Sequence, residues 1–172
     1  MKRMNSAYAN KLLKQLDDDK SFYLNKEASS CTYIVALGEE PVVPDYDYSE
    51  TAKTIDEIDS KIQAIKHAIN MANVNQTIDV QGKKYSVDTV LVRMAQLNKR
   101  KNVLERMRKQ MPKERQESRG YLSNRTNVPE YKYINYDLDL IKSEFERISE
   151  EIMAMQIALD KHNQTFEFDV EI

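Results

Sequence analysis

The feature that most constrains this chain is a strict heptad pattern of apolar residues between Leu138 and Leu159. The apolar side chains alternate steps of three and four: Leu138, Ile141, Phe145, Ile148, Ile152, Met155 and Leu159. Seven of the 15 residues between them are charged. A helix with this pattern has one apolar edge, which a partner helix must cover. We therefore predict a long helix at about 137–162 that packs on at least one other helix.

A second helix, at about 51–74, carries a seam of the same spacing. Its members are Ile55, Ile58, Ile62, Ile65, Ile69 and Ala72. Ser49, Thr51 and Thr54 are all suitable residues to cap its start. Because the two seams share one period, we expect this helix to be the mate of the 138–159 helix.

Two further helices are predicted at about 6–28 and 87–111. The first follows Asn5 and Ser6, which are good N-cap residues. The second begins after Ser86, and Lys101 occupies a position in its stripe where an apolar residue is expected. With four helices and few chain breakers, the fold class is mainly α, with long antiparallel helices in hairpins or a coiled-coil-like bundle.

Four segments do not have a helical pattern. Residues 77–85 contain two short β-prone runs around Gly82, which favours a β-hairpin. Residues 165–172 alternate apolar and polar side chains, as in a strand with one buried face. Residues 29–35 should be extended or a short strand. Residues 112–135 lack periodicity and are expected to form a long loop, which is more often functional than not.

Composition sets the broad class. A chain of 172 residues is expected to form a single domain, 1–172. The net charge of −2 disfavours generic polyanion binding, and the lone Cys31 suits a reducing compartment. The N-terminus does not resemble a signal peptide, and the longest apolar run is too short to span a membrane. We expect a cytoplasmic protein.

Positive charge is concentrated in residues 99–119. This window contains nine basic and three acidic residues, a balance of +6. Tyrosines and further basic residues follow directly. Arginine binds phosphate in a bidentate manner, and tyrosine can stack on a base. The candidate ligand-binding residues are Arg108, Arg115, Arg119, Tyr121, Arg125, Tyr131, Lys132 and Tyr133.

A structural interpretation of the same residues stays open. Basic side chains near a helix C-terminus are favoured by the helix dipole, and charge runs are usually solvated surfaces. His67 has no metal-ligand spacing, and His162, near the end of the 138–159 helix, should suit the dipole as an imidazolium. No catalytic motif, metal site or cofactor site is predicted, so we expect a protein that is not an enzyme.

Several short segments carry a resemblance along most of the chain. They are the Gly38-Glu39-Glu40-Pro41 segment, Ile69-Asn70 with Asn73, Gly82, Ser86, the Arg119 and Tyr121 pair split by Gly120, and Asn163-Gln164-Thr165. In these features the chain resembles the septicolysin-like family, small helical proteins of bacteria and their phages. At the last segment Gln164 replaces the tryptophan of the family pattern.

Three functions are compatible with these observations. The first is a non-enzymatic oligomer that sequesters a phosphate-bearing, nucleotide-derived small molecule. In a phage this would be an anti-defence sponge in the host cytoplasm. The second is a structural or protein-interaction helical module. The third, which the negative net charge disfavours most, is nucleic-acid binding through the basic window.

Overall fold

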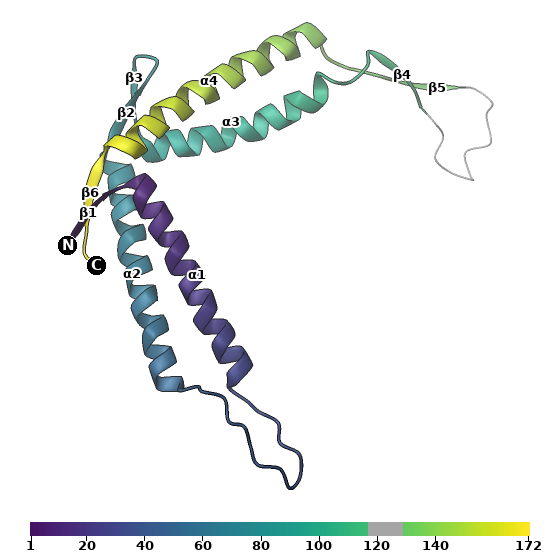
Figure 1. The fold of residues 1–172 in the computed structure, drawn as a ribbon. Coiled ribbons are helices and arrows are strands. Elements are labelled where there is room, and N and C mark those ends of the chain that lie inside the picture. Colours follow the sequence, from purple (N-terminus) through teal and green to yellow (C-terminus); the bar gives the residue numbers. More distant parts are fainter. Residues whose placement is uncertain (117–128) are drawn as a thin grey trace. The chain divides into compact units, whose positions relative to one another are not determined.

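The computed structural model describes residues 1–116 and 129–172 and is mainly α-helical (Figure 1). The helices are α1 (Ser6–Ser30), α2 (Tyr48–Asn75), α3 (Val87–Met107) and α4 (Leu138–Thr165). The strands are β1 (Lys2–Asn5), β2 (Thr77–Val80), β3 (Lys83–Ser86), β4 (Lys113–Gln116), β5 (Glu130–Tyr133) and β6 (Glu167–Val170). The predicted mainly-α fold class is therefore confirmed.

The chain divides into two compact units. Unit 1 comprises Met1–Ile78, Ser86–Asp88 and Leu159–Ile172. Unit 2 comprises Asp79–Tyr85 and Thr89–Ala158. A single domain over the whole chain stays a prediction.

Unit 1 is built on the α1–α2 helical hairpin. Asn5 caps α1 as predicted, because its side-chain oxygen accepts a hydrogen bond from the Tyr8 backbone N–H at 2.8 Å. The Ile seam of α2 packs against α1 in one core cluster. Its buried members are Met4, Ala9, Leu16, Ile58, Ile62, Ile65 and Val170.

A two-stranded antiparallel sheet, β1–β6, completes unit 1. The register pairs Lys2 with Val170 and Met4 with Phe168. Val170 is 1% exposed and Met4 is 3% exposed, so each strand contributes a side chain to the core. The predicted C-terminal strand is thus confirmed in a shorter form. Its partner β1 was not predicted, because four residues with one buried side chain give no readable alternation.

In unit 2, α3 and α4 form a second helical hairpin, joined through the ribbon β4–β5. The seam of α4 is buried at Ile141, Ile148, Ile152 and Met155, and α3 buries Val90, Leu97 and Leu104. Glu151 of α4 accepts hydrogen bonds from Arg93 of α3 at 3.0 Å and from Arg147 at 3.0 Å. The ammonium of Lys101 lies over the Phe145 ring, 5.3 Å from its centroid. The position of α3 where an apolar residue was expected therefore contacts an aromatic ring of α4 through a cation–π interaction.

The predicted pairing of the two long seams was wrong. The α2 seam packs on α1 inside unit 1, and residues 138–158 of α4 belong to unit 2 with α3. A heptad seam shows that a helix needs a partner, without identifying it. Helices joined by a local connection pair most readily, and that is the outcome here.

Several predicted boundaries also change. Asp47 caps α2 in place of Ser49, Thr51 or Thr54, with its carboxylate 2.8 Å from the Glu50 backbone N. Ser29 and Ser30 still belong to α1, and no strand forms between 31 and 47. α3 ends at Met107 rather than at residue 111. The predicted loop at 112–135 contains the paired strands β4 and β5 at its two ends.

The predicted hairpin at 77–85 is confirmed as β2–β3. Its two turn residues, Gln81 and Gly82, have φ angles of 53° and 82°. Two consecutive positive φ angles are the signature of a tight hairpin turn whose twist matches its strands. The Asp79 carboxylate accepts a hydrogen bond from the Gly82 N–H at 2.8 Å and holds this turn.

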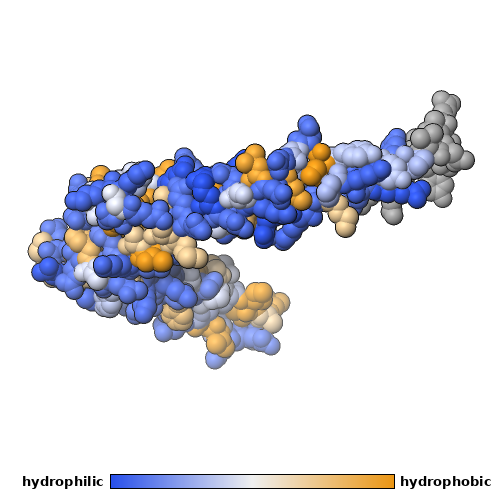
Figure 2. All heavy atoms as spheres, turned by 90° about the horizontal axis from the view of Figure 1, so that it is seen from above, coloured by the Kyte–Doolittle hydropathy of each residue, from blue (hydrophilic) through white to orange (hydrophobic). Residues whose placement is uncertain are grey.

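Most of the visible surface is hydrophilic, with separate hydrophobic patches (Figure 2). Across the residues that the structure describes, no helix has an apolar stretch long enough to cross a membrane.

Candidate functional site

The candidate site is the two-stranded ribbon formed by β4 and β5 (Figure 1). The antiparallel register places Lys113 opposite Tyr133 and Arg115 opposite Tyr131. Opposed residues share a face, and residues two apart along a strand share it too. Lys113, Arg115, Tyr131 and Tyr133 therefore lie on one face, which we call the ribbon face.

The ribbon face combines two cations with two aromatic rings and carries no carboxylate. The Lys113 ammonium lies 4.2 Å from the Tyr131 ring centroid and 5.5 Å from that of Tyr133. Both rings are exposed, at 43% and 61% respectively. This arrangement offers cations to an anion and π faces to a planar ring or a cation.

The base of the ribbon is fixed to the helices that carry it. The Tyr136 hydroxyl donates a hydrogen bond of 2.7 Å to the carbonyl of Met107, the last residue of α3. The Ile134 N–H donates to the Pro112 carbonyl at 3.3 Å, extending the ladder below the strands. Asp137 then caps α4 by accepting from the Asp139 N–H at 2.8 Å. Hydrogen bonds therefore fix the start of β4 and the end of β5 to the ends of α3 and α4.

The opposite side of the ribbon differs in charge. Lys132 lies across from Glu114, and Gln116 lies across from Glu130. Lys132 was predicted as a ligand-binding residue, but the alternation of β5 separates it from Tyr131 and Tyr133. Its charge is also offset by the neighbouring carboxylates. The ribbon face is the only side of the described ribbon on which every charge is positive.

Arg108 lies apart from the ribbon strands and is already engaged. Its guanidinium contacts Glu105 at 2.6 Å and stacks 4.1 Å from the Phe145 ring centroid. Hydrogen bonds from Arg108 and then Lys109 lower the pKa of Glu105 to about 2. These contacts give Arg108 a role in joining α3 to α4. The ribbon therefore gathers Arg115, Tyr131 and Tyr133 on one face and leaves Arg108 elsewhere.

Three predicted residues, Arg119, Tyr121 and Arg125, lie outside the described residues. One residue of the ribbon face, Lys113, was missing from the predicted site. A signal for it exists in the sequence: in Lys113-Glu114-Arg115-Gln116 the cations are two residues apart. With the period of a strand, that spacing places both on one side.

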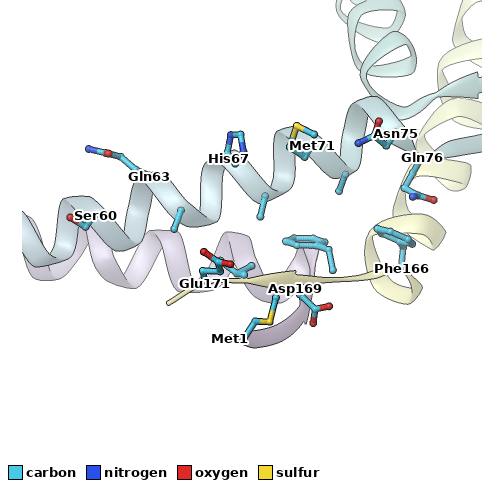
Figure 3. A pocket seen from close by; sticks show the side chains of 15 residues that line it. Met1, Ser60, Gln63, His67, Met71, Asn75, Gln76, Phe166, Asp169 and Glu171 are labelled. Atoms are coloured by element: carbon cyan, nitrogen blue, oxygen red, sulfur yellow. The ribbon is translucent and has the colours of Figure 1, made fainter.

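A groove of about 780 Å³ lies in unit 1 between α2 and β6 (Figure 3). Its walls are mainly apolar and include Met71, Phe166 and Phe168, while Asp169 and Glu171 bring carboxylates to it. Carboxylates repel phosphate, so this groove does not suit the anion that the basic window was expected to bind. It is a separate feature from the ribbon.

Among the described residues, the histidines and the cysteine do not join other side chains in a metal site. Within residues 1–116 and 129–172 no group of three His, Cys, Asp or Glu side chains is placed to hold a metal ion. Burial lowers the pKa of His162, which stacks on Phe166 with ring centroids 5.0 Å apart. Burial therefore opposes the imidazolium form that the dipole of this helix end would favour.

Comparison with known proteins gives no match to a family model, to a curated protein or to a solved structure. The resemblance to the septicolysin-like family stays a prediction.

Proposed function

We propose that this protein is a non-enzymatic binding protein that sequesters a phosphate-bearing, nucleotide-derived small molecule at the ribbon face. The observation that carries the proposal is the shared face of Lys113, Arg115, Tyr131 and Tyr133. In the phage setting that the family resemblance implies, such a protein would act as a sponge for a nucleotide signal in the host cytoplasm.

Each residue type on the face has a distinct part in this proposal. The planar Arg115 guanidinium can hold two phosphate oxygens at once, while Lys113 supplies a mobile point charge. The Lys113 ammonium lies over the tyrosine rings. When the ammonium turns to a phosphate, a ring face becomes free to stack on the base. Binding would thus exchange one cation–π contact for an ion pair and a stacking contact.

Calorimetric titration of the full chain tests the proposal directly. The probes are ADP-ribose, ATP and cyclic mononucleotides, with inorganic phosphate and adenosine as partial probes. We expect at least one complete nucleotide to bind better than either partial probe, because charge and stacking contribute together. No heat with any phosphate-bearing probe, at protein concentrations of roughly 100 µM, would contradict the proposal.

Matched variants of the ribbon separate a specific face from a general charge effect. Arg115→Gln should weaken binding by about ten-fold or more, since a hydrogen bond to a charged group contributes about 1.5–3 kcal/mol. Tyr131→Leu should weaken it about five-fold or more through lost stacking. Lys132→Gln makes the same charge change as Arg115→Gln on the opposite side and should change affinity less than about two-fold. Equal losses from Arg115→Gln and Lys132→Gln would argue against a site on the ribbon face.

Nucleic-acid binding is a second candidate, because all eight residues of the two ribbon strands are exposed. A two-stranded β-ribbon fits the major groove of DNA, and exposed tyrosines can stack on unpaired bases. This candidate predicts binding of oligonucleotides with a steep salt dependence. A mononucleotide bound as tightly as an oligonucleotide, with little change between low and high salt, would exclude it. A protein partner retained without any small molecule would favour the interaction-module alternative.

A further inference from the structure

The segment between α1 and α2 exposes an unusual amount of apolar surface. In residues 31–47, which we call the α1–α2 loop, Ile34 is 100% exposed, Leu37 is 108% exposed and Val42 is 90% exposed. Tyr33, Val35 and Val43 are exposed as well. Exposed apolar side chains in one contiguous segment are typical of surfaces that bind another protein or a membrane.

The α1–α2 loop is held at its end by a specific contact. The Tyr46 hydroxyl donates a hydrogen bond of 2.9 Å to the Glu27 carboxylate of α1. The pKa of Tyr46 is raised to about 12, mainly by desolvation and to a smaller extent by this hydrogen bond. Asp47 then caps α2. The apolar side chains are therefore presented from a tethered segment at the end of the α1–α2 hairpin.

The charge around the loop restricts what can cover it. Residues 39–59 contain eight acidic residues and one basic residue, a net charge of −7. Of these eight acids, only Asp59 forms an ion pair with a described residue, and its partner is Lys20 at 2.7 Å. An anionic membrane surface or a nucleic acid would be repelled. The complementary surface must be apolar and basic.

The outer face of α3 has that chemistry. Val92, Lys99, Val103 and Arg106 recur at helical spacing on the side opposite to the buried Val90, Leu97 and Leu104. All four are exposed. Lys99 and Arg106 form no ion pair with any described residue. The acids of α3 are Asp88 and Glu105, and the second of these is paired with Arg108 and Lys109.

We propose that the α1–α2 loop of one copy docks on the outer face of α3 of a second copy. Ile34, Leu37 and Val42 would cover Val92 and Val103, while Glu39 and Glu40 would face Lys99 and Arg106. Each copy carries both surfaces, so the contact builds a closed dimer or ring when its rotation closes. The proposal is independent of the ribbon face, because none of its residues belongs to β4 or β5.

Sedimentation velocity on the full chain, from about 1 to about 100 µM, measures this association. We expect a mass above that of one copy at the upper end and weaker association at high salt, because the facing charges are screened. Leu37→Asp should weaken association about ten-fold or more by placing a charge in the apolar contact. The matched control is Ile157→Asp, an equal change at a side chain of α4 that is 64% exposed, and it should leave the mass unchanged.

A charge-swap pair identifies the two contacting surfaces. Glu39→Lys with Glu40→Lys, and separately Lys99→Glu with Arg106→Glu, should each yield monomers with unchanged helical circular dichroism. Mixing the two monomeric variants should restore a complex, since the swapped loop of one then matches the swapped helix of the other. A monomeric wild-type protein at every concentration, or a mixture that fails to associate, overturns the proposal. Nucleotide titrations of the same variants report on the ribbon face separately.

Discussion

Burial makes protonation of the His162 imidazole less favourable in the folded protein. Its Nε2 atom is buried without a hydrogen-bond partner among the described residues, and its ring stacks on Phe166 with an interplanar angle of 11°. The pKa of His162 is lowered by desolvation. An unfolded chain has no such penalty, so it binds a proton at a higher pH than the folded chain does.

This difference predicts a loss of stability in acid. The contribution of His162 is complete above its ordinary pKa of about 6.5 and is lost as the pH falls through the lowered value. In urea unfolding, the difference in midpoint between pH 7.5 and pH 5.5 should shrink in His162→Phe. The exposed His67, changed to Gln, is the control and should keep the wild-type difference. A wild-type pH difference retained in His162→Phe would show that other groups cause it.

The predicted binding residues do not all lie on the same face of the ribbon. Residue chemistry pointed to Arg115, Tyr131 and Tyr133, and the ribbon places them on one face. Lys132 is of the same chemical type but lies on the other side, and Arg108 is held by Glu105 and Phe145. Residue type and closeness in sequence therefore identify candidate binding residues. The register of the strands determines which of these residues lie on the same face.

The β2–β3 hairpin depends on the backbone freedom of one glycine. Gly82 has a φ of 82°, and a Cβ added there would meet nothing within 4 Å. Gly82→Ala should therefore cost only the backbone strain, about 1–2 kcal/mol of unfolding free energy. Lys84→Ala, at an exposed strand position, should stay within about 0.5 kcal/mol of wild type. Chemical denaturation measures both, and a neutral Gly82→Ala would mean that the turn adopts another conformation.

Whole elements were predictable where apolar side chains repeat with one period. The seam of α4 and that of α2 were both found from spacing alone. β4 was not found, because Lys113-Glu114-Arg115-Gln116 is exposed throughout and thus has no apolar alternation. The cap of α2 was misplaced because Asp47, Ser49, Thr51 and Thr54 all satisfy the same local rule. The partner of each seam depends on tertiary packing, which a local pattern does not contain.

At the scale of the molecule, the two compact units raise the question of whether they unfold together. Ile65 in unit 1 and Leu104 in unit 2 are both 0% exposed. Truncation of either to alanine should cost about 2–5 kcal/mol. If the units are separate cooperative blocks, Ile65→Ala should lower amide protection in α1 and α2 while residues 90–104 of α3 keep theirs.

The reciprocal variant completes this test. Leu104→Ala should lower protection in α3 and in residues 138–158 of α4, and leave α1 and α2 protected. Native-state hydrogen exchange followed by mass spectrometry reads both patterns. Equal loss of protection over the whole chain in both variants would instead support the single domain predicted from the sequence.

The β1–β6 sheet has a topological consequence for unit 1. Since Lys2 pairs with Val170, the two ends of the described chain are neighbours across one ladder. Paired residues in an antiparallel sheet lie about 4.5–5.5 Å apart, so a few added residues can connect them without strain. We therefore expect a circular permutant that links Lys2 and Val170 through a short added segment to fold. New termini within residues 31–47 would leave α1, α2 and the terminal sheet intact, and the ladder that now joins the ends would become a continuous hairpin.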